Sequence, residues 1–435
     1  MTNTVKDVLE FVSENDIKFI KLAFCDLFGV QKNIAIMADE LCEVFENGIS
    51  FDASAINGFS DVTASDLLLF PDPVTLTVLP WRPQQGRVVR FYCDIMNPDR
   101  TPFSGDSRYI LKKAVKRAQD MGYVCKIGTE CEFYLFKTDE NGDPTSKTLD
   151  NGGYLDIAPL DKGENIRREI CLCLEEMGIR PEASHHEQGP GQNEVDFRFD
   201  DALNTADNLL TFKLVVKAIA ERNGLFASFM PKPIPDKSGS GLHINISLSK
   251  NGFNIFNSPD KVTDSFVAGV LERTPEMTLF LNPLTNSYER FGKFEAPKYI
   301  SWSHQNRSQL IRVPAATGEK MRFELRSPDP ALNPYLTLAL IINAGLDGIN
   351  KKRILPDPLN VDLYKADSKI TDSLSVLPES LTSAITMAKN SDFVENIIGK
   401  DVLSRFLTAK EQENSEFSES GNKEFFYNER YFSII

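Results

Sequence analysis

A short aromatic-rich run, residues 128–136 (Gly-Thr-Glu-Cys-Glu-Phe-Tyr-Leu-Phe), predicts a buried strand that carries two carboxylates, Glu130 and Glu132. Because side chains alternate along a strand, both carboxylates point to the same face, roughly 7 Å apart at a rise of about 3.3 Å per residue. Carboxylates at this spacing repel each other, and a divalent cation with oxygen ligands is the usual way to offset the repulsion. The alternative for such a tripeptide is an ordinary solvated strand face.

Other candidate metal ligands lie far along the chain. Glu187 and Glu194 bracket a glycine-rich loop, and His243 and Glu324 each lie in a strand-like run. Together with the first pair they make five carboxylates and one imidazole, which fit two hard divalent ions such as Mg²⁺ or Mn²⁺ with three protein ligands each. Taken singly, His243 also fits a core histidine and the loop glutamates fit exposed charge. Their joint occurrence on strand faces and in one loop favours the metal interpretation.

Five arginines follow in a compact region of the sequence: Arg290, Arg307, Arg312, Arg322 and Arg326. Arginine binds phosphate and carboxylate in a bidentate manner and keeps its charge, so a cluster beside a metal site predicts a nucleoside triphosphate or an acidic substrate. A surface face paired with acids is the alternative. The chain has no Walker A or GxGxxG sequence, so metals and arginines would have to hold a nucleotide. These residues alone indicate a two-metal phosphoryl-transfer or phosphate-hydrolysing enzyme.

Strands with one polar face must position these side chains. In the runs 194–199, 241–248 and 321–326 apolar and polar residues alternate, which predicts strands with one apolar and one polar face. Helices are expected between them at 108–121, 165–177 and 206–223. Strands that turn charged faces toward a common concavity predict an antiparallel sheet curved around an active site.

The first hundred residues have a different organisation. We expect a helix at 5–14, strands at 17–24 and 31–37, a helix at 38–46, and a linker at 97–106 that ends in a helix cap. The domains are therefore expected to divide as 1–104 and 105–435. Beyond Leu332 the chain is predicted to be mainly helical, ending in a polar, acidic stretch around residues 410–423.

Composition limits the class of protein. The chain has 435 residues, 41% of them hydrophobic, and 48 Lys and Arg against 62 Asp and Glu give a formal charge of -14. Without a basic block, nucleic acid is not expected as a partner. The first 14 residues lack a signal-peptide core, and the longest apolar stretch, 336–346, is too short to span a bilayer. We therefore expect a cytoplasmic protein with no membrane partner.

Cysteine usage agrees with that compartment. Seven cysteines occur without a CxxC pair, and most lie in apolar runs. They are expected to be reduced core residues, with neither a disulfide framework nor a zinc site.

From Ile17 to Gly348 the chain resembles the glutamine synthetase family. The motifs that carry the resemblance are Phe51-Asp52, Gly128-Thr-Glu-Cys-Glu-Phe, Ala183-Ser-His-His-Glu187, Pro190-Gly-Gln-Asn-Glu194, Lys232-Pro, Gly239-Ser-Gly-Leu-His243, Asn286-Ser-Tyr-Glu-Arg290, Asn306-Arg307-Ser, Ile311-Arg312 and Arg322-Phe-Glu-Leu-Arg326. The resemblance implies an α+β fold, in which a small N-terminal β-grasp-like domain precedes a larger catalytic domain with a curved antiparallel sheet backed by helices.

The resemblance also implies roles for individual residues. One of two divalent ions, Mg²⁺ or Mn²⁺, would be held by Glu132, Glu187 and Glu194, and the other by Glu130, His243 and Glu324. ATP would be contacted by Glu182, Ser247, Arg307, Arg312 and Arg322. The substrate L-glutamate would lie against Gly239, Arg290, Glu295 and Arg326.

The implied reaction is ATP-dependent ligation of ammonia to L-glutamate. The γ-carboxylate attacks the terminal phosphate of ATP to give γ-glutamyl phosphate, with Arg307 and the metals offsetting the charge. Asp52 and Glu295 match the family residues that bind and deprotonate ammonium. The family forms homo-oligomers, hexameric rings usually stacked as homododecamers, so Asp52 would serve the site of the adjoining subunit.

The sequence departs from the family pattern at several positions. Asp52 is followed by Ala-Ser-Ala where Gly-Ser-Ser is usual, Ser238 replaces an asparagine before Gly239, and the segment between Arg290 and Glu295 is one residue shorter than in common members. Two alternatives stay open: a γ-glutamyl-polyamine ligase of the same family, and a non-catalytic structural or regulatory member. The presence of both Asp52 and Glu295 favours ammonia over a larger amine.

Overall fold

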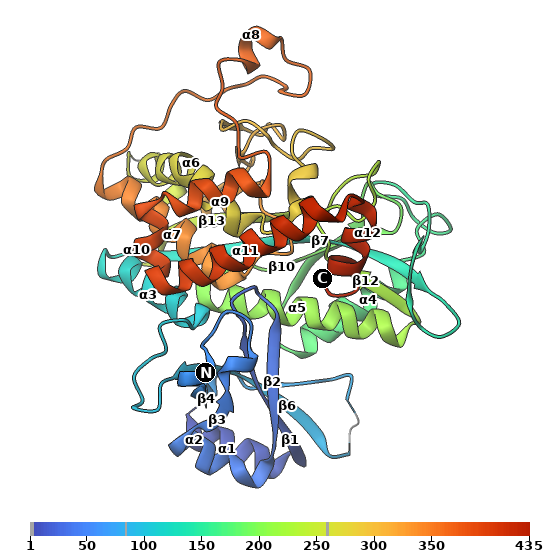
Figure 1. The fold of residues 1–435 in the computed structure, drawn as a ribbon, viewed down its shortest axis with the longest axis vertical. Coiled ribbons are helices and arrows are strands. Elements are labelled where there is room, and N and C mark those ends of the chain that lie inside the picture. Colours follow the sequence, from blue (N-terminus) through green and yellow to red (C-terminus); the bar gives the residue numbers. More distant parts are fainter. Residues whose placement is uncertain (1–3, 83–84, 258–260) are drawn as a thin grey trace.

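The computed structural model describes residues 4–82, 85–257 and 261–435 (Figure 1). In Figure 1 the N-terminal part, in blue, lies below the long helix α5 (Ala202–Arg222), and the rest of the chain forms a larger body around and above this helix. The described residues form one six-stranded and one eleven-stranded sheet, both combined with helices. The predicted α+β class, with a small N-terminal unit and a larger sheet backed by helices, is confirmed.

The N-terminal unit is a mixed sheet with two helices packed on it. Its strands run in the order β2-β1-β6-β4-β3, with β5 beside β6, and β1 and β6 are parallel while the other pairs are antiparallel. Ile20, Leu22, Val89 and Phe91 are fully buried in its core. The elements are α1 (Val5–Glu14), β1 (Ile17–Cys25), β2 (Gln31–Met37), α2 (Leu41–Asn47), β3 (Ile49–Asp52), β4 (Asp66–Pro71), β5 (Thr77–Val78) and β6 (Arg87–Met96).

Arg108 joins the two units of the chain. It lies in α3 (Ser107–Asp120), which begins after Asp106, whose side chain accepts a hydrogen bond from the backbone N–H of Arg108. The Arg108 guanidinium lies 2.9 Å from carboxylate oxygens of Asp72 and Asp94 in the N-terminal unit and of Asp207 in α5. Arg108 and Asp207 are buried and the other two aspartates are partly buried, so this charged contact holds the N-terminal sheet against the larger body.

The larger body is built on the fifteen-residue strand β7 (Val124–Thr138). The main strand order is β15-β16-β17-β13-β7-β10-β9, antiparallel except for the pair β15 and β16, with β8, β11 and β12 also beside β7 and β14 beside β13. The other strands are β8 (Pro144–Thr148), β9 (Pro181–His186), β10 (Gln192–Phe197), β11 (Asp200–Asp201), β12 (Leu225–Ser228), β13 (Leu242–Lys250), β14 (Phe253–Asn254), β15 (Trp302–His304), β16 (Ile311–Val313) and β17 (Phe323–Leu325).

Helices cover the apolar face of this sheet. Two of them, α6 (Lys261–Leu281) and α7 (Pro334–Asn350), cross at glycines: a Cβ on Gly269 would lie 2.3 Å from the carbonyl oxygen of Ala344. None of the helices in the described ranges is long and apolar enough to cross a membrane. The remaining helices are α4 (Glu164–Glu176), α8 (Ser368–Thr371), α9 (Leu381–Lys389), α10 (Asp392–Ile398), α11 (Lys400–Ser420) and α12 (Lys423–Tyr427). Short helical turns lie at Ala38–Glu40, Ala53–Ala55, Val62–Ala64, Pro73–Thr75, Ile255–Asn257, Thr285–Glu289, Gly318–Lys320 and Asn428–Phe432.

Most predicted elements agree with the structure within one or two residues, and the boundaries of three elements differ. The strand predicted at 321–326 is only Phe323–Leu325, so Arg322 precedes it and is not part of the alternating strand face. The strand predicted at 194–199 begins earlier, at Gln192, and ends at Phe197. The helix predicted from residue 206 begins at Ala202, because Asp201 caps it by accepting a hydrogen bond from the backbone N–H of Asn204.

Candidate active site

Strand β7 lies at the centre of the candidate site. Its Glu132 is the register partner of Glu194 on β10, and its Glu130 is the partner of Asp196 on β10 and of His243 on β13. Opposite residues on neighbouring antiparallel strands extend side chains to the same face of the sheet. The strand pairing therefore gathers two carboxylates and an imidazole around the two β7 glutamates predicted from the sequence.

A first cluster consists of Glu130, His243 and Glu324, whose ligand atoms all lie within 4.8 Å of one another. The Nδ1 atom of His243 is 3.3 Å from Oε2 of Glu130 and 3.5 Å from Oε1 of Glu324. Glu324 is fully buried between two arginines: Nη1 of Arg326 is 2.5 Å from its Oε1, and Arg312 donates to its Oε2. All three side chains point to one place, so together they could hold one cation.

Cationic neighbours keep the acids of the first cluster ionised. Burial raises the pKa of Glu130, but hydrogen bonds from His243 and Asn245 outweigh it and lower the pKa to about 2. Burial also opposes ionisation of Glu324, and the charges of Arg326 and His243 bring its pKa below the ordinary value. Both carboxylates are therefore charged acceptors at neutral pH.

A second cluster consists of His185, Glu187 and Glu194, again with ligand atoms within 4.8 Å of one another. Nδ1 of His185 is 3.5 Å from Oε1 of Glu187, and Nε2 is 3.5 Å from Oε1 of Glu194. Within the described residues Glu132 stands beside this tight group, not inside it, and its Oε2 accepts a hydrogen bond of 2.8 Å from the backbone N–H of Gly241. The predicted set of Glu132, Glu187 and Glu194 thus lies together, with His185 added.

The second cluster has an excess of negative charge. Burial and the charge of Glu187 raise the pKa of Glu132 to about 7, and burial and the three neighbouring glutamates raise that of Glu194 well above its usual range. Burial, Glu194 and Glu130 raise the pKa of Asp196 to about 9. A hard divalent cation would remove this repulsion, so the donor set fits an ion such as Mg²⁺ or Mn²⁺.

A tight turn between β9 and β10 presents the second cluster. The backbone N–H of Glu187 donates to the carbonyl of Gln192, and Gly191 has φ of 69°. A Cβ on Gly191 would lie 2.8 Å from the carbonyl oxygen of Leu135, so only glycine fits this approach to β7. The glycine-rich composition of this loop therefore serves to bring Glu187 and Glu194 against β7.

A third group of potential ligands, Asp150, Asp161 and His186, is already fully engaged. His186 is buried, with Nε2 2.9 Å from Oδ1 of Asp150 and Nδ1 2.6 Å from the carbonyl oxygen of Glu187. Asp161 is paired with Arg167 at 2.5 Å. These contacts support the turn that carries Glu187, so we assign this group a structural role.

Three of the five predicted ATP contacts share one cavity with Glu130 of the first cluster. Glu182, Ser247 and Arg322 line a cavity of about 240 Å³ whose walls also include Glu130 and Asp196. Arg312 reaches the first cluster through its hydrogen bond to Glu324. Arg307 is exposed and acts electrostatically on Glu187, lowering the pKa of that carboxyl, against the larger effect of burial.

Gly239, one of the predicted glutamate contacts, is joined to Glu132 through the side chain of Gln192. Gly239 packs against Arg290, because a Cβ there would lie 2.6 Å from Cγ of Arg290 and 2.5 Å from the carbonyl oxygen of Pro231. Arg290 and Arg326 are buried, and Arg326 donates a hydrogen bond of 3.3 Å to the carbonyl of Glu295. The Glu295 side chain is exposed, at a positive φ of 66°.

Asp52 is not brought to these clusters within the chain. It lies at the end of β3 in the N-terminal sheet, is exposed, and accepts hydrogen bonds from the backbone N–H and the hydroxyl of Ser54 at 2.9 and 2.6 Å. These contacts lower its pKa, so it is a carboxylate at neutral pH. Its place on a separate sheet agrees with a role outside its own chain's site.

Sequence reasoning left four contributors to the site without a role: His185, Gln192, Asp196 and Asn245. Three of them could have been found by counting along the strands: Asp196 is two residues after Glu194 and Asn245 two residues after His243, on the same strand faces. Gln192 carries the same signal, since it lies two residues before Glu194 on β10. His185 carried no such signal, because its place opposite Glu194 depends on the pairing of β9 with β10.

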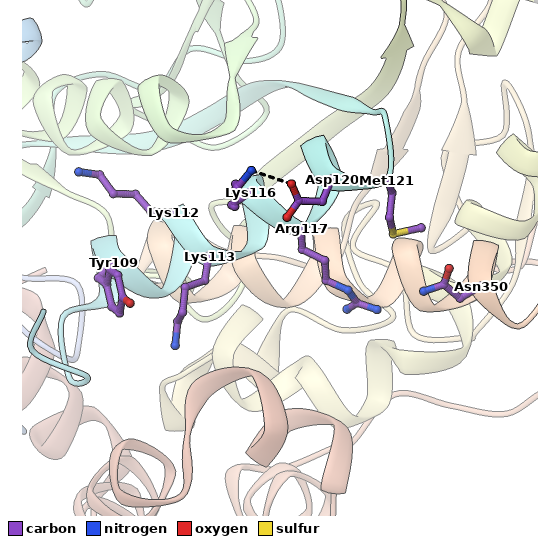
Figure 2. Close-up of a pocket in the computed structure, with 8 residues that line it drawn as sticks. All are labelled: Tyr109, Lys112, Lys113, Lys116, Arg117, Asp120, Met121 and Asn350. Atoms are coloured by element: carbon purple, nitrogen blue, oxygen red, sulfur yellow. Dashed lines mark hydrogen bonds and ion pairs between the residues drawn. The ribbon is translucent and has the colours of Figure 1, made fainter.

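A second hollow on the surface lies over α3 (Figure 2) and is not a site of this kind. Its basic residues already have partners: Lys116 pairs with Asp120 at 2.6 Å, Arg117 with Asp347 at 2.6 Å, and Lys112 with Asp94 at 2.6 Å. Figure 2 shows the side chains fanning out along the helix without a common point. The lining residues are Tyr109, Lys112, Lys113, Lys116, Arg117, Asp120, Met121 and Asn350.

Comparisons with known proteins agree with the geometry. Residues 16–98 match the family model "Glutamine synthetase, beta-Grasp domain", and residues 104–427 match "Glutamine synthetase, catalytic domain". The chain is 49% identical over 423 residues to a glutamine synthetase of Methanosarcina mazei, covering 95% of each chain. It is 47% identical over 419 residues to one of Clostridium saccharobutylicum, covering 94% of this chain and 95% of the relative.

Solved structures resemble the whole chain. An ADP complex of GmaS superposes with a TM-score of 0.88 at 30% identity, over 99% of both chains. A glutamine synthetase of Plasmodium falciparum superposes with a TM-score of 0.85 at 26% identity, over 98% of both. These likenesses confirm the predicted β-grasp-like N-terminal domain and the catalytic domain that follows it.

Proposed function

The chain belongs to the glutamine synthetase family of ATP-dependent glutamate–ammonia ligases, and we propose how its residues divide the work of joining ammonia to L-glutamate. The observation that carries the proposal is the convergence of the ligand atoms of Glu130, His243 and Glu324 within 4.8 Å, next to the charge-rich group of Glu187 and Glu194. Two cation-binding groups beside buried arginines support phosphoryl transfer to a carboxylate.

Two divalent ions, Mg²⁺ or Mn²⁺, fit the two groups. Glu132, Glu187 and Glu194 would hold one ion, with His185 adjacent, and Glu130, His243 and Glu324 would hold the other. Bound there, the ions offset the negative charge of the transferred phosphate. Arg312 now occupies one oxygen of Glu324, so we expect it to turn from that oxygen to a phosphate when ATP binds.

The first half-reaction forms γ-glutamyl phosphate. Glu182, Ser247, Arg307, Arg312 and Arg322 hold ATP, and the cavity that three of them line supports this role. Gly239, Arg290, Glu295 and Arg326 hold glutamate with its γ-carboxylate toward the terminal phosphate. That carboxylate attacks the phosphorus and ADP leaves, while Arg307, which is exposed and acts on the charge of Glu187, offsets the developing charge.

The second half-reaction needs ammonia at the γ-carbon of γ-glutamyl phosphate. Asp52 and Glu295 are both exposed carboxylates that attract ammonium and take its proton, after which ammonia displaces phosphate and glutamine is formed. Asp52 lies on the separate N-terminal sheet, so we propose that it completes the site of an adjoining subunit. This requires a homo-oligomer, which we take to be hexameric rings, single or stacked as a homododecamer.

Two further expectations belong to the proposal. The domains divide as 1–104 and 105–435, directly before Asp106 caps α3. The protein acts in the cytoplasm on glutamate, ammonium and ATP, without a nucleic-acid or membrane partner.

The test is an assay of glutamine formation from glutamate, ATP and ammonium, with putrescine tested in parallel as the amine. We expect turnover with ammonium and little with the diamine. Turnover with putrescine alone would point to the polyamine-ligase alternative. No ATP-dependent phosphate release with any amine would point to a non-catalytic member.

A further inference from the structure

Gln192 is a buried carboxamide at the start of β10 whose side chain touches three parts of the site. Its Nε2 donates to Oε2 of Glu132 at 2.9 Å and to the carbonyl of Gly239 at 3.1 Å. Its Oε1 accepts from the backbone N–H of Gly189 at 2.9 Å and from the hydroxyl of Ser238 at 2.6 Å. A carboxamide has two N–H donors and two acceptor lone pairs, so every hydrogen-bonding position of Gln192 is used.

These partners fix the orientation of the amide. The backbone N–H of Gly189 can only donate, which places Oε1 on that side and leaves Nε2 facing Glu132 and Gly239. The loop of Ser238 and Gly239 is also held from β7, because the hydroxyl of Tyr134 donates to the carbonyl of Ser238 at 2.6 Å. One side chain therefore connects a carboxylate of the cation site with the loop against which glutamate would lie.

A second buried carboxamide makes the equivalent connection on the nucleotide side. Nδ2 of Asn245 donates to Oε1 of Glu130 at 2.9 Å, and its Oδ1 accepts from Nε of Arg322 at 2.7 Å. Glu132 and Glu130 of β7 thus each accept a hydrogen bond from a carboxamide side chain. Each carboxamide also contacts a residue proposed to bind a substrate. The two bridges differ in what they reach: Gly239 in one case and Arg322 in the other.

We propose that Gln192 is a positioning residue that couples cation binding at Glu132 to glutamate binding at Gly239, while Asn245 couples Glu130 to the nucleotide through Arg322. The inference rests on the proposed roles of Glu132, Gly239 and Arg322. When an ion binds Glu132, the carboxylate is drawn to it and the amide that shares its oxygen holds the glutamate loop in place. Removing a side chain that hydrogen-bonds a metal ligand typically weakens metal binding about 10- to 100-fold.

The test uses Gln192→Met, which keeps the length of the side chain and removes all four hydrogen bonds. Mn²⁺, glutamate and ATP binding are measured by calorimetry on the full-length protein without turnover. We expect one of two Mn²⁺ ions to bind about 10-fold more weakly. We expect glutamate binding in the presence of Mn²⁺ to weaken by about fivefold or more, and ATP binding to change less than about twofold. Asn245→Leu should show the opposite pattern, with ATP binding weakened and glutamate binding kept.

A matched control is Asn343→Leu. Asn343 is another buried carboxamide, on α7, that donates to the carbonyl of Ala339 and accepts from Arg117 of α3. This variant should lose thermal stability and keep both ligand affinities. If Gln192→Met does not fold, Ser238→Ala removes only the hydroxyl partner of Oε1 and should weaken glutamate binding by about threefold.

The results distinguish a failure of the proposed function from a failure of the coupling role of Gln192. If the wild-type protein binds no Mn²⁺, the proposed function and this inference fall together. If the wild type binds two ions and Gln192→Met, or the Ser238→Ala fallback, binds Mn²⁺ and glutamate as the wild type does, only the coupling role of Gln192 is wrong. Equal losses of glutamate and ATP binding, as from general loosening of the fold, would also overturn it.

Discussion

His243 lies directly across the strand ladder from Glu130, with its Nδ1 3.3 Å from Oε2 of that carboxylate. The contact exists because β13 pairs with β7 in a register that places Leu242 opposite Cys131 and Ile244 opposite Thr129. A shift of one residue would turn His243 to the apolar face of the sheet. The register of two strands therefore determines whether this cation-binding group exists.

Replacing Glu324 with alanine should abolish activity, at least about a thousandfold, because one cation group loses its buried carboxylate. The change also leaves Arg312 and Arg326 without the acid that lies between them. Mn²⁺ titration should give one ion per subunit instead of two. Two tightly bound ions and near-normal turnover would exclude Glu324 as a ligand.

Replacing Asp52 with alanine should slow amide formation more than it slows formation of γ-glutamyl phosphate. The residue is exposed and its hydrogen bonds are local, so its loss removes the ammonium site without disturbing the catalytic sheet. The two half-reactions can be separated by measuring ADP release and glutamine formation in the same sample. Equal loss of both would contradict the assigned role.

Mixed assemblies provide the control for the intersubunit part of this prediction. Asp52→Ala subunits, slow in amide formation alone, and Glu324→Ala subunits, inactive alone, should form glutamine faster when they are dissociated and reassembled together than either does by itself. Recovery is expected only if Asp52 serves a neighbour, because a mixed interface then holds one intact site. Mixtures that are no faster, although they assemble, would place Asp52 outside the neighbouring site.

The sequence predicted the places of some site residues and not of others. The alternation of apolar and polar residues was enough to place Glu130, Glu132, His243 and Glu194 on strand faces. It could not show that β13 and β10 flank β7, because strand order depends on long-range packing. Arg322 was placed on the strand face of Glu324, but the strand begins at Phe323 and Arg322 instead reaches Asn245.

The metal-free protein should lose stability as pH rises from about 5 to about 8. The pKa of Glu132 is about 7 in the folded chain against 4.5 ordinarily, so the folded state holds a proton that the unfolded state has released. The stabilisation is complete below pH 4.5 and is lost as pH passes 7. Glu132→Gln should show a shallower fall of the melting temperature, and Mn²⁺ should stabilise the wild type more at pH 8 than at pH 5.5. Parallel curves for the variant and the wild type would contradict the assignment.

Replacing Arg108 with methionine should destabilise the chain by about 3–5 kcal/mol, because three aspartates lose their shared buried partner. Lys116→Met is the matched control: its ion pair with Asp120 is exposed, and its loss should cost less than about 1 kcal/mol. Urea unfolding of the two variants under identical conditions measures the difference. Equal midpoints would show that the buried network does not fix the two domains together.

The most direct test of the central claim is an anomalous-scattering map from crystals of the protein grown with Mn²⁺. The account predicts two peaks per subunit, one among Glu130, His243 and Glu324 and the other among Glu132, Glu187 and Glu194. Peaks at Asp150, Asp161 and His186 instead, or an absence of peaks at the β7 glutamates, would contradict it.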